Sequence, residues 1–247
     1  MVVENVKKGI NGENHSFAAA IIIGLGFIVG VISGCDVGDD DAPTFPDISY
    51  VGLYHASPDA PPLDVIMEQG RINYFPLRYA EYTNYLNFYA GERTMRVRPA
   101  NASNVVLDTT FFFETAAAYS LFYVNEYTDI QALLVEDEEV ALSLGEAAVR
   151  FIHLSPDSQE LDLIRSVGDE TTALAQGNAY LDATLFTIVE SGVQSFQVNL
   201  TGSGEEVLSI PDVGLRSGGV YTIVARGYSS PPSGNVNNLN AHVLINN

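Results

Sequence analysis

The sequence predicts an all-β protein made of two tandem immunoglobulin-like β-sandwich domains that follow an N-terminal signal helix. Three observations predict this: one apolar run near the start, a segment that repeats 98 positions later, and apolar residues that alternate with period two inside each copy. The chain has 247 residues, of which 47% are hydrophobic, so it can bury two cores of ordinary size.

The first element is a predicted signal peptide over residues 1–34. Lys7 and Lys8 precede an uncharged run at residues 17–32, FAAAIIIGLGFIVGVI. As a helix this run is about 24 Å long, shorter than the hydrocarbon core of ~30 Å. A basic region, an apolar run and small residues therefore indicate a cleaved leader. An N-terminal anchor helix is the alternative.

The residues at the end of this run define the anchor. Ile32, Ser33, Gly34 and Cys35 resemble a bacterial lipobox, and that resemblance implies that Cys35 is acylated and becomes the first residue of the mature protein. Cys35 is the only cysteine, so it has no partner for an internal disulfide. Two or more acyl chains hold a protein stably on a membrane. We expect the membrane to be its partner through this lipid.

Residues 35–47 are predicted to be an acidic flexible tether, with five aspartates and two prolines. Asp36 resembles the signal that retains some lipoproteins in the inner membrane, whereas an acidic stretch at this place accompanies surface export in other bacteria. We expect a bacterial cell-envelope location, with the outer membrane or cell surface favoured over the inner membrane.

The two sandwiches are predicted at residues 48–140 and 146–247. YVGLYHASPDAPPLDVIM, which begins at Tyr50, matches AVRFIHLSPDSQELDLIR, which begins at Ala148. Each copy is about 95 residues long, which indicates duplicated domains, because solenoid units are shorter. Short strands separated by Gly, Pro, Asn and Asp clusters are typical of sandwiches.

Charge and motifs exclude several functions. The net charge of −20 makes nucleic-acid binding unfavourable, because phosphate backbones are contacted by Lys and Arg clusters. The chain lacks the sequence signatures of metalloproteases, dithiol redox proteins and nucleotide-binding proteins. We therefore expect no cofactor and no resident metal.

The repeated turn contains residue types that also form catalytic triads. His55 lies in phase with core residues Val51 and Leu53, so we expect it to be buried with its ring bonded to the turn. Ser-Pro-Asp is itself a turn signal. The signature residues are therefore interpreted as structural, with no catalytic residue; an envelope hydrolase using His55 and Asp59 is the alternative. The signature comprises His55, Ser57, Pro58, Asp59 and Asp64 in copy one, and His153, Ser155, Pro156, Asp157 and Asp162 in copy two.

Two other hypotheses concern ligands. Asp64 and Asp162 are out of phase with the core and are expected to point outward or to cap loops, although Asp59, Asp64 or the run at residues 136–139 could bind calcium in a carbohydrate-binding module. Tyr79, Tyr82 and Tyr85 could form a platform for a glycan or an envelope protein, since tyrosine offers a large contact area with a polar tip. Ordinary strand packing also explains these tyrosines and is the interpretation that we favour.

The segment HASPDAP, His55 to Pro61, resembles the bacterial family called domain of unknown function 4397, and the likeness extends over most of residues 48–247. Copy two departs from it, with Leu154 in place of the alanine and Ser158-Gln159 in place of Ala-Pro. The resemblance implies a β-rich fold and an envelope location, and it implies no activity.

Overall fold

The structure is a computed structural model that describes residues 47–68 and 70–246. These residues belong to one compact unit, residues 45–247. No helix in this part of the chain is long and apolar enough to cross a membrane. The predicted signal peptide, Cys35 and its neighbours Ile32, Ser33 and Gly34 lie outside the described residues.

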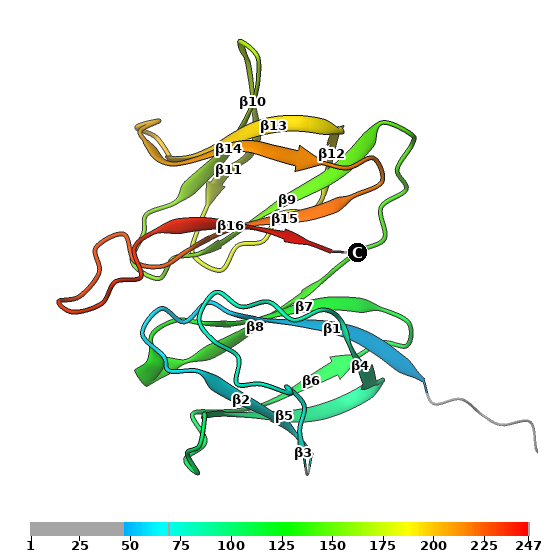
Figure 1. The fold of residues 1–247 in the computed structure, drawn as a ribbon, viewed down its shortest axis with the longest axis vertical. Helices are drawn as coiled ribbons and strands as arrows, with labels where there is room; N and C mark the ends of the chain where they lie inside the picture. Colours follow the sequence, from blue (N-terminus) through cyan, green and yellow to red (C-terminus); the bar gives the residue numbers. More distant parts are fainter. Residues whose placement is uncertain (1–46, 69, 247) are drawn as a thin grey trace, which may run out of the picture. The chain divides into compact units, whose positions relative to one another are not determined.

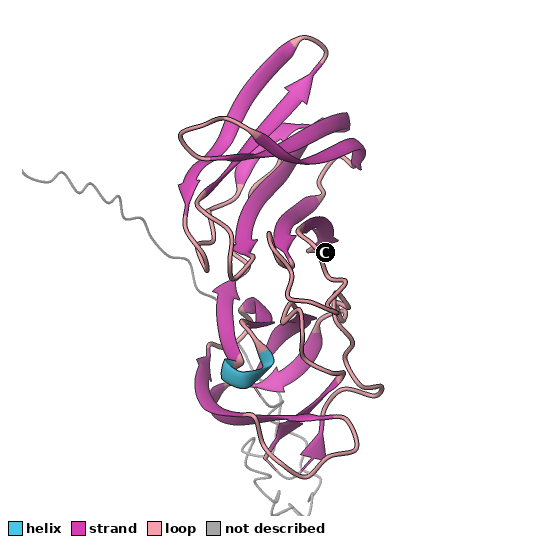
Figure 2. Cartoon of the chain, turned by 90° about the vertical axis from the view of Figure 1, so that its left-hand side faces the viewer, coloured by secondary structure: helices cyan, strands magenta, loops and turns pink. Residues whose placement is uncertain are grey.

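Strands dominate the regular secondary structure of the described residues and form sandwiches, which confirms the all-β class and the sandwich architecture (Figures 1 and 2). Its short 3-10 helix is η2 (Tyr127–Asp129), which follows β7. Each sandwich has eight strands, β1 to β8 and β9 to β16.

In the first sandwich, one sheet has the order β4-β1-β7-β8 and the other the order β3-β2-β5-β6. The strands of the first sheet are β1 (Ile48–His55), β4 (Leu86–Tyr89), β7 (Ala118–Val124) and β8 (Gln131–Glu136). Those of the second are β2 (Leu63–Met67), β3 (Gly70–Arg71), β5 (Gly91–Pro99) and β6 (Leu107–Phe113). β1 and β7 run parallel at the centre of their sheet.

The second sandwich repeats this arrangement with the orders β12-β9-β15-β16 and β11-β10-β13-β14. The first of these sheets contains β9 (Glu146–Leu154), β12 (Thr187–Glu190), β15 (Val220–Arg226) and β16 (Asn240–Ile245). The second contains β10 (Leu161–Val167), β11 (Glu170–Asn178), β13 (Gly192–Leu200) and β14 (Glu206–Leu215). β9 and β15 are parallel, like β1 and β7.

The period-two pattern builds the core of each sandwich. In the first, Val51 and Leu53 of β1 pack against Leu63 and Val65 of the facing sheet. In the second, residues 98 positions later, Val149 and Phe151, pack in the same way. Burial of alternate apolar side chains on the inner face of each sheet is the main force that holds the two sheets together.

A third core lies where the β1 sheet meets the β9 sheet. It contains Tyr54 and Phe122 from the first sandwich, and Ile152 and Val224 from the second, all fully buried. The strands at the centre of these two sheets therefore bury both faces, as their long apolar runs allow.

Beside this third core, one matched position carries very different residues in the two copies. Gly52 of β1 corresponds to Arg150 of β9, because Gly52 pairs with Ser120 and Arg150 with Thr222 in the same register. A Cβ atom at Gly52 would overlap the Tyr82 ring. The glycine thus makes room for Tyr82, whereas the matching position of the second sandwich carries a long cation.

Candidate functional site

The histidines of the repeated turns are buried in both sandwiches. His55 and His153 are each 0% exposed. His55 Nε2 lies 3.2 Å from the carbonyl oxygen of Pro61, and His153 Nε2 lies 3.0 Å from that of Gln159, so both rings bond the same backbone position six residues on. The histidine therefore ties the end of the strand to the chain that leaves the turn.

The turn aspartates accept hydrogen bonds from a second loop. Asp59 Oδ1 accepts the N–H of Tyr127 at 2.7 Å. Asp157 accepts the N–H groups of Ser229 and Ser230 at 2.7 and 2.8 Å. In each sandwich the aspartate thus caps the loop that follows the strand parallel to its own, which is a fold-stabilising use of a short carboxylate.

The geometry around His55 differs from that of a catalytic triad. Within the described residues no hydrogen bond joins His55 to Ser57 or Asp59, and Ser57 Oγ is buried without a partner. Burial lowers the pKa of His55 to about 4. The ring is therefore neutral at pH 7, and its Nε2 faces a carbonyl oxygen, to which it can only donate.

The other repeated aspartates are also occupied. Asp64, 4% exposed, does not point outward: it pairs with Arg71 at 3.0 Å and lies 3.8 Å from Arg98. Asp162 accepts the N–H of Gly177 at 2.7 Å and the hydroxyl of Thr201 at 2.6 Å.

The carboxylates considered for calcium point to different places. Asp59 caps a loop, Asp64 pairs with arginine, and Asp137 of the acidic run pairs with Arg150. Across residues 47–68 and 70–246, no three His, Cys, Asp or Glu side chains gather in a group that could hold a metal ion. The calcium hypothesis thus gains no support from the placement of these residues.

Tyr79, Tyr82 and Tyr85 are half-buried where the two sandwiches meet. Tyr79 accepts a hydrogen bond from Arg226 at 3.0 Å, and the Arg226 guanidinium lies 4.9 Å from the centre of its ring. Tyr82 packs beside Tyr54, with ring centres 6.4 Å apart. Tyr85 donates to Asp137 at 2.5 Å. These contacts favour the packing alternative over an open platform.

Polar side chains from both sandwiches form a buried cluster, here called the junction network. Its members are Tyr85, Ser120, Asp137, Arg150, Thr222 and Asn246.

The ion pair between Arg150 and Asp137 is the centre of the junction network. The two side chains are 1% and 5% exposed. All three guanidinium nitrogens have acceptors: Nε donates to Thr222 at 2.8 Å, Nη1 to the Glu136 carbonyl at 3.0 Å, and Nη2 to Asp137 and Ser120. The guanidinium also lies 4.5 Å from the centre of the Phe186 ring.

The carboxylate side of the pair is equally well bonded. Asp137 Oδ2 accepts the hydroxyls of Tyr85 at 2.5 Å and Ser120 at 2.8 Å. Asn246 joins the network by accepting from Thr222 at 2.7 Å. A buried ion pair is tolerated when such hydrogen bonds compensate its lost hydration, and loss of one partner leaves an uncompensated charge.

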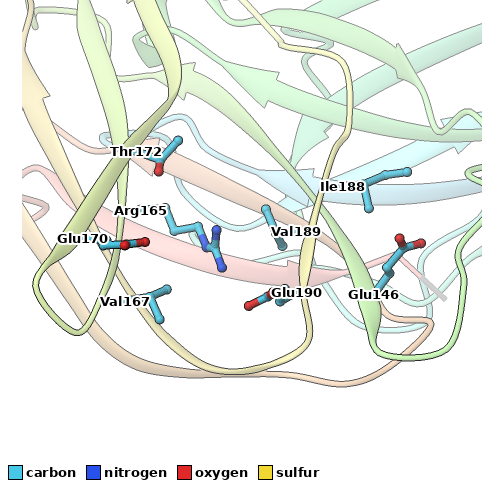
Figure 3. A pocket seen from close by; sticks show the side chains of 8 residues that line it. All are labelled: Glu146, Arg165, Val167, Glu170, Thr172, Ile188, Val189 and Glu190. Atoms are coloured by element: carbon cyan, nitrogen blue, oxygen red, sulfur yellow. The ribbon is translucent and has the colours of Figure 1, made fainter.

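A hollow of about 370 Å³ lies in the second sandwich (Figure 3). Arg165 points into it, with Glu170 and Glu190 nearby. Arg165 Nε already donates to Gln194 at 2.6 Å. The hollow therefore has mixed charge and a cation that is already engaged, and nothing in its lining selects a particular ligand.

Sequence reasoning missed Arg150. The signal was present, because Arg150 alternates with Val149 and Phe151 but shares its face with Ile152 and Leu154. Apolar residues on both faces of one strand indicate a strand buried on both sides. A charged residue in such a strand requires a buried partner.

Comparison with known proteins adds one finding. Residues 49–164 match the model of the family described as Domain of unknown function (DUF4397). The match includes both Ser-Pro-Asp turns and supports the resemblance of the HASPDAP segment to the DUF4397 family. No curated protein matches the chain.

The buried histidine predicts both a stability loss and a pH dependence. His55→Ala should lower the free energy of unfolding by about 2–4 kcal/mol, because it removes a packed ring and its hydrogen bond. Because folding lowers the pKa of His55 from 6.5 to about 4, its neutral form stabilises the native protein above pH 6.5 and this contribution falls as the pH drops towards 4. At pH 5 the loss is about 2 kcal/mol, and the variant should lack it.

Urea unfolding of native protein and His55→Ala at pH 7 and pH 5 measures both effects. A variant with native stability and the native pH dependence would contradict the structural role.

The junction network predicts strong coupling between its two charges. Arg150→Met and Asp137→Asn should each lower the free energy of unfolding by about 3–5 kcal/mol, because each leaves a buried unpaired charge. The double variant should lose less than the sum of the two by at least ~1 kcal/mol. Arg96→Met is the matched control, since its pair with Asp108 is 3.9 Å long and exposed and should contribute under ~1 kcal/mol. Additive losses in a double-mutant cycle would refute the coupling.

Proposed function

We propose that this chain is a lipid-anchored bacterial cell-envelope protein whose two sandwiches are tandem copies of the DUF4397 domain. In this proposal they form a non-catalytic module for binding, adhesion or spacing at the cell surface or in the periplasm. The observation that carries it is the junction: a shared apolar core and a buried ion pair make one body of the two sandwiches. Two sandwiches joined in this way keep their outer loops in one arrangement relative to each other, as a spacer or binding arm requires.

The internal symmetry supports tandem copies. Both sandwiches have the same strand order, the same parallel central pair and the same bond from histidine to the carbonyl six residues later. Thr83 and Thr184 likewise accept the N–H groups of Leu53 and Phe151. A duplicated domain explains this agreement directly, since the same contacts recur at matching positions of the two sandwiches.

The rival function is an envelope hydrolase that uses His55 and Asp59. A general base must reach the proton that it removes, within about 3 Å. His55 is fully buried and its Nε2 is committed to the Pro61 carbonyl, while Asp59 bonds the Tyr127 N–H. Both residues therefore make hydrogen bonds that stabilise the fold, and this favours the non-catalytic module over the hydrolase.

The anchor rests on the sequence, and acylation of Cys35 tests it. Cys35→Ser should abolish incorporation of a clickable fatty acid and should leave an unprocessed precursor, because the acyl-bearing diacylglyceryl group is transferred to a thiol. Ser33→Ala is the control, since it keeps a small residue before the cysteine. Mass spectrometry of the mature N-terminus should find an acylated Cys35. A native membrane protein that retains Met1, or equal labelling of Cys35→Ser, would rule out the lipid anchor.

A further inference from the structure

The two sandwiches differ in the connection that crosses from one sheet to the other. The connection begins at matching residues in the two sandwiches. Asn73 Nδ2 donates to the Leu63 carbonyl at 2.9 Å, and Asn178 Nδ2 donates to the Leu161 carbonyl at 3.0 Å. Tyr79 and Tyr180 also match, because their rings stand edge-on to His55 and His153, with centres 6.1 and 6.2 Å apart.

Between these matched points the first sandwich has five residues, 74–78, and the second has only Ala179. The first sandwich therefore has four extra residues here. They include Tyr74 and Phe75, which are 83% and 73% exposed. The two rings are perpendicular, with centres 4.6 Å apart. Adjacent exposed aromatic side chains on an added loop indicate a contact surface, whereas scattered single ones need no explanation.

The backbone that holds this pair is firmly bonded. Arg71 donates to the Tyr74 carbonyl at 2.9 Å, and Asn73 donates to the Phe75 carbonyl at 2.8 Å. Asn73 is 5% exposed and also accepts the Val65 N–H at 2.8 Å. Leu77 then exchanges two backbone hydrogen bonds of 2.8 Å with Leu63. A prearranged loop loses little conformational entropy on binding.

Phe75 forms one wall of a hollow of about 420 Å³, a size typical of small-ligand sites. Pro62 and Pro76 extend the apolar wall, and the polar lining comes from Arg78, Glu81 and Asn101. Glu81 accepts the Arg78 N–H at 2.9 Å, and this hydrogen bond orients its carboxylate. The hollow thus combines an apolar wall with hydrogen-bond donors and acceptors.

We infer that Tyr74, Phe75 and the adjoining hollow form a binding site for a neutral glycan. A pyranose ring presents C–H groups on its face and hydroxyls around its edge, and this matches an aromatic wall bordered by planar polar side chains. An anionic ligand or anionic lipid surface is disfavoured by the net charge of −20. This site supplies the ligand class for the binding module proposed above, and it does not depend on the lipid anchor.

The test is an array of neutral oligosaccharides, including cellohexaose, chitohexaose and maltohexaose, probed with the full chain in a polyoxyethylene detergent that carries no sugar. The native protein should bind a subset of them. Tyr74→Ala/Phe75→Ala should weaken that binding by about tenfold or more, because aromatic anchors dominate such contacts. Phe112→Ala is the matched control, since Phe112 is 62% exposed on β6, and it should bind like the native protein.

Parallel experiments test whether another kind of ligand binds at this site and whether each variant is folded. Proline-rich peptides and phosphatidylglycerol vesicles replace the glycans, and thermal unfolding confirms that each variant is folded. The inference is overturned if no glycan binds, if the double variant binds glycans like the native protein, or if its loss appears only with peptides or vesicles. A normal Cys35 lipid label alongside failed glycan binding would overturn this site and leave the proposed anchor intact.

Discussion

The ion pair between Arg150 and Asp137 fixes how the two central sheets meet. Removing two charges from water is costly, and the cost is offset only where hydrogen bonds surround both ions. Tyr85 and Ser120 bond the carboxylate, while Thr222 and the Glu136 carbonyl bond the guanidinium. Because these partners come from both sandwiches, a shift of one sheet along the other would leave buried charges without partners.

This constraint explains why so many polar groups of the chain serve the fold. The central strands have apolar residues on both faces, so polar side chains among them need partners inside the protein. The Tyr54 hydroxyl is hydrogen-bonded to His242 Nδ1 at 3.0 Å. The side-chain amides of Asn235 and Asn237 donate to the Pro58 carbonyl in the turn of the first sandwich. The signature turn thus also contributes to the contact between the two sandwiches.

The sequence was sufficient to predict the strands, and it was insufficient to predict their outer contacts. Alternation at Val149 and Phe151 identifies the inner face of β9, because the partner sheet lies in the same repeat. It does not identify what covers Arg150, whose partner Asp137 comes from the other sandwich. The same limit applies to the tyrosines: their composition suits either a platform or packing, and only the position of Arg226 and Asp137 distinguishes the two.

The two sandwiches expose different side chains in the connection that crosses between their sheets. The matched residues Tyr79 and Tyr180 keep the same contact with histidine, while the chain before Tyr79 is longer and carries Tyr74 and Phe75 outside. A constant offset of 98 does not reveal this difference, because the offset is 105 between Asn73 and Asn178 and 101 between Tyr79 and Tyr180. Shared contacts maintain the fold, and the added loop gives the first sandwich a surface that the second lacks.

The claim that the junction makes one body of the two sandwiches is tested most directly by calorimetric unfolding of the full chain. We expect a single transition whose calorimetric enthalpy equals its van't Hoff enthalpy, because neither sandwich can unfold without exposing the third core and the ion pair. Two resolved transitions, or a calorimetric enthalpy about twice the van't Hoff value, would show that the sandwiches unfold independently and would contradict it.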